Sequence, residues 1–245
     1  MTNTTSFADW QAKAKALTIR SQAFIDGEYV DAVSGKTFSC ISPSDGTCLA
    51  RIAECESADV ELAVAAARRA FDAGVWSEAS PVHRKKTLQK FARLIEQHAE
   101  ELALLESLDM GKPVADALSI DVSASVRCLD WTAEAIDKVY GEIAPTPQHE
   151  LGLITREPLG IIAAIVPWNF PLLMATWKFA PALAAGNSVI LKPSEKSPLS
   201  AIRIAALALE AGIPAGVFNV LPGFGKGAGE PLALHMDVDG LVFTG

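Results

Sequence analysis

Two short polar stretches follow apolar runs, and their side chains could act on a small uncharged molecule. VPWNFP, residues 166–171, holds Asn169 between two prolines, whose fixed backbone angle favours a rigid loop. The Asn169 amide could donate a hydrogen bond to a substrate oxygen, or it could cap the following helix. KPSEKSP, residues 192–198, holds Lys192 and Glu195. This pair could donate to and accept from two neighbouring hydroxyls, as a ribose diol requires, or it could be a solvated turn with a helix cap.

A third stretch, GFGKGAG at residues 223–229, is rich in glycine but fits neither phosphate-binding motif. The dinucleotide fingerprint G-x-G-x-x-G fails because Ala228 stands where the third glycine should be. A P-loop fails because Lys226 is followed by Gly227 rather than Ser or Thr. What remains is a glycine-lined passage where a flat ring could lie against bare backbone.

The cysteines and histidines show neither the spacing of a metal site nor that of a catalytic triad. The four cysteines contain no C-x-x-C pair and have no histidines at zinc spacing, so we interpret them as buried or incidental thiols of a reducing compartment: Cys40, Cys48, Cys55 and Cys128. The four histidines are scattered, which supports neither a metal site nor a Ser-His-Asp triad: His83, His98, His149 and His235.

The composition favours small-molecule chemistry. The 245 residues are 50% hydrophobic, enough for one large α/β domain or two small ones. A net charge of -8 argues against nucleic acid and anionic membranes, which both select basic surfaces. No run approaches the roughly 18 apolar residues of a membrane span, and the polar start lacks the pattern of a signal peptide. We therefore expect a cytoplasmic protein.

The second half of the chain alternates strands and helices. Apolar runs without polar alternation predict strands, and capped amphipathic segments between them predict helices, in the order strand 160–166, helix 171–186, strand 188–192, helix 197–212, strand 217–221, helix 227–235 and strand 241–245. This alternation predicts a parallel sheet covered on both faces, with ligands at the carboxyl ends of its strands. The polar stretches above stand at those ends.

The first half has strand and turn signals followed by helices. Residues 22–52 suggest a small hairpin layer. Helices are expected after a capping Ser57, from Ser80 with Pro81 at the first position, from 98 to Gly111, and from 116 to 140.

Taken together, the motifs resemble the aldehyde dehydrogenase superfamily from about residue 20 to the end. PWNFP, the GN-x-x-x-x-KPSE-x-(S/T)P stretch, LDMGKP and VFTG stand in the family's order. AEAIDKVYGEIAPT and SEKSPLSAIR are most similar to the branch acting on γ-glutamyl-γ-aminobutyraldehyde and related amino-aldehydes. The resemblance implies a Rossmann-like α/β fold with an oligomerisation hairpin: residues 1–140 begin the cofactor-binding domain, 141–158 form the arm that pairs subunits into dimers or tetramers, and 159–245 form an incomplete cofactor-binding core.

The resemblance also implies roles for individual residues. The family uses NAD, with NADP possible, and an aldehyde substrate; a cysteine thiolate attacks the aldehyde, and the resulting thiohemiacetal becomes a thioester. Asn169 matches the oxyanion donor. Further positions match the cofactor site, namely Ile165, Val166, Pro167, Trp168, Lys192, Glu195, Gly225, Gly229 and Gly245, while Phe170, Met174 and Trp177 match walls of the aldehyde tunnel. Asp109, with backbone oxygens near Ile41 and Lys196, matches a monovalent-cation ligand but could equally be a polar helix-end residue, so the metal stays unknown.

The chain ends on LVFTG, at the first residue of the turn that in the family leads to the cofactor pyrophosphate. We therefore expect about half of an aldehyde dehydrogenase, without the family's glutamate base and cysteine nucleophile, and no activity from the 245 residues alone. The alternative is a binding or oligomerisation module without turnover. An ordinary Rossmann dehydrogenase is disfavoured by the failed glycine fingerprint.

Overall fold

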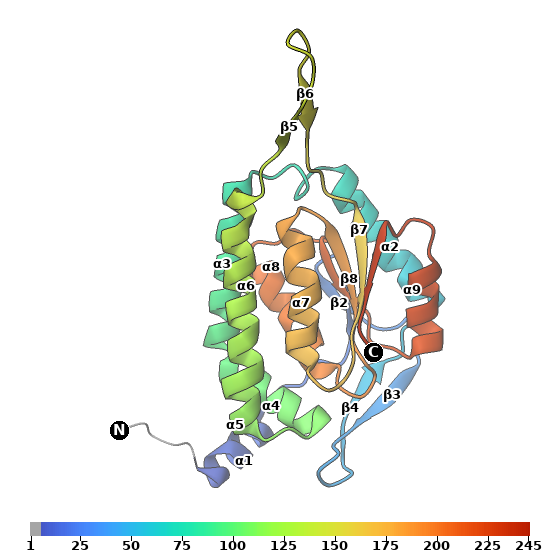
Figure 1. Cartoon of the computed structure of the whole chain (residues 1–245). Coiled ribbons are helices and arrows are strands. Elements are labelled where there is room, and N and C mark those ends of the chain that lie inside the picture. Colours follow the sequence, from blue (N-terminus) through green and yellow to red (C-terminus); the bar gives the residue numbers. More distant parts are fainter. Residues whose placement is uncertain (1–5) are drawn as a thin grey trace.

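The structure, a computed structural model, describes residues 6–245 and is built around one six-stranded sheet (Figure 1). The strands follow the order β10-β7-β8-β9-β1-β2 across it: β1 (Ala23–Ile25), β2 (Glu28–Val30), β7 (Ile161–Ile165), β8 (Ser188–Lys192), β9 (Phe218–Val220) and β10 (Gly240–Phe243). Two separate two-stranded ribbons are β3 (Thr37–Ile41) with β4 (Cys48–Ala53), and β5 (Glu142–Ala144) with β6 (Gly152–Ile154).

The four strands from the second half of the chain are parallel, as predicted. They form a continuous apolar layer because both faces are covered. Alternate residues point to opposite faces: Ile161 and Ala163 pack into one core cluster, whereas Ala164 packs into the other. From β7 the chain moves through β8 to β9 and then returns to the other side of β7 as β10. The strand order therefore reverses between β7 and β10, and open α/β sheets bind ligands beyond the carboxyl ends of their strands at such a point.

The sheet has more strands than the sequence predicted, and it includes antiparallel as well as parallel pairs. Instead of one hairpin layer over residues 22–52, the chain forms β1–β2, which joins the main sheet antiparallel to β9, and β3–β4, which stays apart. Asn219 fixes this junction: it is fully buried, and its Oδ1 accepts from the Asp26 N–H at 3.0 Å. The tie depends on residues far apart in sequence, which hairpin signals alone do not reveal.

Helices cover both faces of the sheet (Figure 1). One face carries α7 (Pro171–Ala184) and α8 (Leu199–Ala211), and three further helices pack behind them: α3 (Pro81–Gln97), α4 (Ala99–Met110) and α6 (Ser123–Ala135). The opposite face carries α2 (Ser57–Asp72) and the short α9 (Glu230–Leu234). Within residues 6–245, no helix has the length and apolar character needed to cross a membrane.

Several predicted helix starts shift in the structure. Ser57 is the first residue of α2 rather than its cap; Glu56 is the N-cap and forms a capping box with Asp59. Pro198, not Ser197, is the N-cap of α8. The Ser80 cap with Pro81 and the Gly111 stop are confirmed.

Two further segments differ from the predicted helices. The segment expected as one helix over 116–140 divides into α5 (Val114–Asp116), a π-helical turn η1 (Ala117–Val122), α6 and a 3₁₀ turn η2 (Ile136–Lys138). The helix expected over 227–235 begins as a π-helical turn, η3 (Gly225–Gly229), before α9. A helix at the start, α1 (Phe7–Ala16), was not predicted because it has no buried face and hence no apolar stripe.

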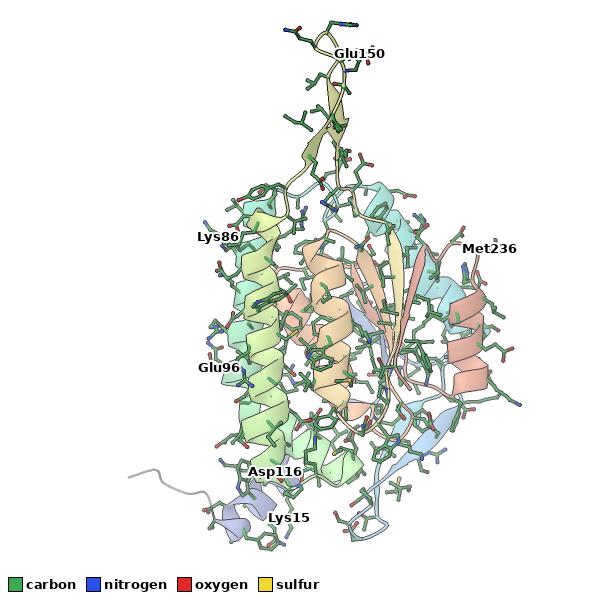
Figure 2. All side chains as sticks on the ribbon, in the orientation of Figure 1. Lys15, Lys86, Glu96, Asp116, Glu150 and Met236 are labelled. Atoms are coloured by element: carbon green, nitrogen blue, oxygen red, sulfur yellow. The ribbon has the colours of Figure 1, made fainter. Side chains whose placement is uncertain are left out.

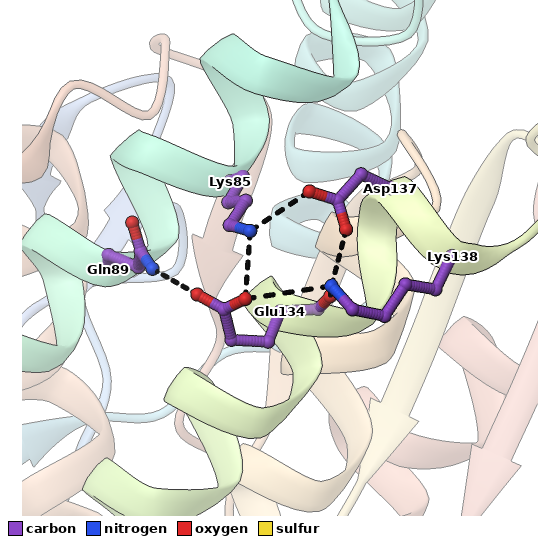
Figure 3. A network of polar contacts seen from close by, with 5 residues as sticks. All are labelled: Lys85, Gln89, Glu134, Asp137 and Lys138. Carbon is purple, nitrogen blue, oxygen red and sulfur yellow. Dashed lines mark hydrogen bonds and ion pairs between the residues drawn. The ribbon is translucent and has the colours of Figure 1, made fainter.

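The β5–β6 ribbon projects away from the sheet and helices, with Glu150 near its tip (Figure 2). Beneath it, Lys85 of α3 joins Glu134 and Asp137 at the end of α6, with Nζ–oxygen distances of 2.8 and 2.9 Å (Figure 3). Hydrogen bonds from Lys138 and Lys85 lower the pKa of Asp137 to about 2. The ionised cluster holds the end of α6 against α3 where the ribbon departs.

Candidate functional site

The parallel register places the ends of three strands at one edge. Ile165 lies opposite Lys192 on one side and Phe243 on the other. The pairing continues past the strands, since Val166 N–H donates to the Lys192 carbonyl at 3.2 Å and Thr244 N–H donates to the Ile165 carbonyl at 3.1 Å. The predicted positions Ile165, Val166, Lys192 and Gly245 therefore meet along this edge, although Ile165 and Lys192 are far apart in sequence.

The VPWNFP loop leaves this edge between β7 and α7. Val166 is buried, Pro167 is partly buried, and Trp168 and Asn169 are exposed. The N-cap of α7 is Phe170, and no side chain of its own loop caps the helix. The helix-cap interpretation of Asn169 is thus wrong. An exposed amide on a proline-fixed loop can donate to a ligand.

Lys192 and Glu195 form a pair at the end of β8. The Lys192 side chain is only 4% exposed, and its Nζ lies 4.0 Å from Glu195 Oε2. Burial lowers the pKa of Lys192, while the Glu195 carboxylate opposes this shift. A solvated turn is therefore excluded. A buried ammonium beside a half-exposed carboxylate offers a donor and an acceptor at a fixed spacing, the arrangement that a vicinal diol can bridge.

The glycine stretch lies beside this pair. Gly223 packs so closely that a Cβ would stand 2.7 Å from the Cys55 carbonyl oxygen, so only glycine fits there. Gly225 has nothing within 4 Å of a Cβ position, which leaves bare backbone facing open space. A Cβ on Gly229 would lie 3.7 Å from Lys192 Cδ and 4.0 Å from Ile165 Cδ1. Gly229, Lys192 and Ile165 are therefore neighbours, as the predicted cofactor positions require.

An open cleft of about 550 Å³ runs along this region. Its lining comes from β3, from α4 and from the loops that follow β7, β8 and β9, and it includes Phe38, Ile41, Asp109, Trp168, Glu195, Lys196 and Phe224. The rings of Phe38 and Phe224 lie 5.2 Å apart. A cleft with aromatic walls and a few polar groups is typical of small-molecule sites.

The VPWNFP loop (166–171) and the KPSEKSP loop (192–198) contact each other. Ser197 Oγ donates to the Trp168 carbonyl at 3.3 Å, and Lys196 Nζ lies 5.8 Å from the centre of the Trp168 ring. The Ser197 hydroxyl, which was predicted to cap α8, forms this hydrogen bond instead. The Asn169 loop and the Lys192–Glu195 loop are therefore held as one unit.

The predicted tunnel residues share one side of α7. Phe170 and Met174 are partly buried and Trp177 is 54% exposed, at the i, i+4, i+7 spacing of a single helix face. Lys112, which the sequence did not predict, places Nζ 3.7 Å from the Phe170 ring centre. The same ammonium pairs with the buried Asp121 carboxylate at 2.6 Å. This contact holds the Phe170 ring against α5 and η1.

Two buried carboxylates of α4 reach the first turns of α7 and α8. Glu106 Oε1 accepts from Leu172 N–H at 2.6 Å, and Asp109 Oδ2 accepts from Leu199 N–H at 2.9 Å. Both carboxylates are nearly inaccessible to solvent. Glu106 was not among the predicted site residues, although its position three residues before Asp109 places both on one face of a helix.

Asp109 and Ile41, two of the suggested cation partners, do line the same cleft as Lys196. Asp109, however, already uses one oxygen to cap α8, and burial raises the pKa of its carboxyl well above the ordinary value. A raised pKa disfavours the anion that a cation would need. Among residues 6–245 there is also no cluster of three or more His, Cys, Asp or Glu suited to a metal. The cation role stays a prediction, and the observed role is that of a helix cap.

The cysteines do not contribute to this edge as activated thiols. Burial raises the pKa of Cys40 to about 12 and raises that of Cys55 still further. The pKa of Cys128 is also raised by burial, and Cys48 lies exposed on β4. Nucleophilic thiols have lowered pKa values, so the interpretation of these four residues as buried or incidental thiols is supported.

The chain belongs to the aldehyde dehydrogenase family, whose family model matches residues 29–245. It is 58% identical over 238 residues to the NADP/NAD-dependent aldehyde dehydrogenase PuuC of Escherichia coli, a match that covers 97% of this chain and 48% of the relative. The chain therefore spans about half the length of this curated relative.

Two solved structures show the same relation. One is a mutant of the indole-3-acetaldehyde dehydrogenase AldA of P. syringae in complex with NAD+ and IAA, with 63% identity and a TM-score of 0.95; the match covers 96% of this chain and 48% of that one. The other is the γ-glutamyl-γ-aminobutyraldehyde dehydrogenase of Burkholderia cenocepacia, with 62% identity and a TM-score of 0.94, covering 96% and 47%. The predicted family and fold class are confirmed.

The buried Glu106 should make stability depend on pH. Burial raises its pKa from 4.5 to about 7, although the Leu172 N–H and Lys112 oppose the shift and Asp121 adds to it. Between these pH values the folded state binds more protons than the unfolded state, so the free energy of unfolding should fall as pH rises from about 4.5 to about 7. Chemical denaturation across this range measures the slope.

Glu106→Gln should flatten this slope, leaving the parts that come from Asp109 and Asp121, whose pKa values are raised in the same direction. Glu100→Gln, on the exposed start of α4, is the matched control and should leave the slope unchanged. Equal slopes in the wild type and in Glu106→Gln would contradict the assignment.

Proposed function

We propose that the whole protein oxidises an aldehyde to a carboxylic acid with NAD+ or NADP+, and that this chain supplies the cofactor cleft and an oxyanion donor. The observation that carries the proposal is the convergence, at one sheet edge of an aldehyde dehydrogenase chain, of the Asn169 loop, the Lys192–Glu195 pair and the glycine stretch. When bound, the cofactor accepts the hydride that leaves the aldehyde carbon.

Asn169 stabilises the negative charge that develops on the aldehyde oxygen. Its neutral amide donates a hydrogen bond without drawing a proton from that oxygen. The prolines and the Ser197–Trp168 bond fix the loop beforehand, so no reorganisation is needed as the charge forms. Phe170, Met174 and Trp177 form an apolar wall that excludes water from the carbonyl.

A cysteine thiolate attacks the aldehyde, the resulting thiohemiacetal loses hydride to become a thioester, and water releases the acid. None of the four cysteines of this chain suits that role, because three have raised pKa values and Cys48 lies exposed on β4, a strand of the separate two-stranded ribbon rather than of the main sheet. We therefore expect no aldehyde turnover from the 245-residue chain alone. An assay of the purified chain with NAD+ and an amino-aldehyde tests this, and measurable turnover would contradict it.

Lys192 and Glu195 hold the two hydroxyls of the adenosine ribose, and Gly225 and Gly229 give the adenine a bare backbone surface. The fit rests on the buried ammonium, the neighbouring carboxylate and the open space at Gly225. Val166, Pro167 and Trp168 continue the site toward the nicotinamide. Gly245, paired into the edge through Thr244, begins the pyrophosphate side.

The substrate is an amino-aldehyde, as the names of similar proteins support: a γ-glutamyl-γ-aminobutyraldehyde dehydrogenase and an aminoacetaldehyde dehydrogenase. The whole protein is a cytoplasmic homodimer or homotetramer. The β5–β6 arm, residues 141–158, pairs the subunits, supported by its projecting shape and its exposed apolar side chains, Ile143, Leu151 and Leu153. Residues 1–140 and 159–245 together form the cofactor-binding domain.

Asn169→Ala in the whole protein should lower kcat about 100- to 1,000-fold while changing cofactor binding little, because the amide acts mainly as charge develops on oxygen. Steady-state kinetics at saturating cofactor measure the effect. Gln11→Ala, which removes an exposed amide on α1, is the control. An unchanged kcat would rule out the oxyanion role.

The protein should prefer NAD+ over NADP+, since the Glu195 carboxylate beside the ribose repels a 2′-phosphate. The Lys192 ammonium 4.0 Å away weakens this repulsion, so the preference should be moderate. The ratio of kcat/KM for the two cofactors measures it, and Glu195→Gln should reduce the ratio. A clear NADP+ preference, or a ratio unaffected by Glu195→Gln, would place Glu195 away from the ribose.

A further inference from the structure

The loops 166–171 and 192–198 lead into α7 and α8, and side chains of another helix cap the first turn of each. Neither α7 nor α8 has a side-chain cap from its own N-terminal residues. The missing acceptors come from α4, where Glu106 takes the Leu172 N–H and Asp109 takes the Leu199 N–H. A buried N–H without a partner is costly, so each carboxylate fixes where its helix begins.

Each capped amide follows a proposed site residue closely in the sequence. Leu172 is three residues after Asn169, and Leu199 is four residues after Glu195. The other end of each loop is fixed in the parallel sheet at Ile165 or Lys192. We infer that Glu106 and Asp109 are positioning residues, Glu106 for the Asn169 loop and Asp109 for the Lys192–Glu195 loop.

The helix that carries these carboxylates is a rigid support. Leu102, Ala103 and Leu105 of α4 are buried in the main core cluster. Glu106 and Asp109 are 0% and 3% exposed, and each has a second carboxylate oxygen without a hydrogen-bond partner. A carboxyl oxygen accepts an N–H whether or not the group is ionised, and this hydrogen bond offsets part of the cost of burying the second oxygen.

The two carboxylates are not equivalent. Glu106 Oε1 also accepts from Ser200 Oγ of α8 at 3.4 Å, so it contacts both helices, whereas the Asp109 side chain bonds to α8 alone. Losing Glu106 should therefore affect both loops, with the larger effect at Asn169. Losing Asp109 should affect mainly the loop of Lys192 and Glu195.

The test uses isosteric variants of the whole protein, and its kinetic arm rests on the function proposed above. Glu106→Met and Asp109→Leu remove the acceptor while keeping most of the volume. Glu106→Gln and Asp109→Asn keep an acceptor oxygen in the same place. Glu100→Gln, on the exposed side of α4 where its carboxylate pairs with Lys13, is the control and should leave the kinetics unchanged.

The expected kinetics differ between the two positions. Glu106→Met should lower kcat about tenfold or more, with a smaller change in the KM for the cofactor. Asp109→Leu should raise the cofactor KM about tenfold and lower kcat less. Glu106→Gln and Asp109→Asn should restore most of each loss. A general loss of folded protein would lower the active fraction in both variants alike and would not give this split.

Hydrogen exchange tests the caps without relying on activity. Amides in 170–176 should exchange faster in Glu106→Met, and amides in 197–203 faster in Asp109→Leu, each relative to the wild type and to Glu100→Gln. Unchanged exchange in both segments would overturn the inference. A Glu106→Gln variant whose kcat is as low as that of Glu106→Met would also overturn the inference. If Glu106→Met does not fold, Glu106→Gln alone decides. A lost kcat in Glu106→Gln together with faster exchange in 170–176 would then overturn the inference.

The outcomes also separate the inference from the proposed function. An unchanged kcat in Asn169→Ala would remove the oxyanion role, while the exchange data still decide the capping. A slow Asn169→Ala together with a Glu106→Met variant of normal kcat and normal exchange would overturn the positioning role alone.

Discussion

The parallel pairing of β7 with β8 is the constraint on which the rest of this structure depends. Because Ile165 stands opposite Lys192, the loops that follow both strands begin at the same edge. A parallel strand next to β7 on its other side, β10, adds the Thr244–Gly245 end to that edge. A shift of register by one residue would turn Lys192 to the opposite face of the sheet and separate it from Gly229.

The helices convert this alignment into a fixed geometry. Each loop is held by its strand at one end and by a capped helix at the other, and Ser197 joins the two loops through the Trp168 carbonyl. Both caps come from α4, whose sequence is distant from either loop. The residues that we propose for the cofactor, the oxyanion and the tunnel wall can therefore keep their positions relative to one another.

Much of this could be predicted from local sequence. The apolar strands, the proline at the start of α7 and the stops at Gly111 and Gly212 are local signals, and the structure confirms them. The motifs placed Asn169, Lys192 and Gly225 at strand ends for the same reason. The contacts that could not be predicted join residues that are far apart in sequence. Asn219 accepts from the Asp26 N–H at the β1–β2 turn, Glu106 caps α7, and Ser197 bonds to Trp168 instead of capping α8. No periodicity encodes such contacts.

We propose that one sheet edge of this chain holds the adenosine half of a nicotinamide cofactor. A crystal structure of the whole protein with NAD+ bound would show the position of the cofactor. We expect the ribose hydroxyls at about 3 Å from Lys192 Nζ and from the Glu195 carboxylate, with the adenine over Gly225 and the nicotinamide directed toward Asn169. A ribose bound away from Lys192 and Glu195 would contradict it.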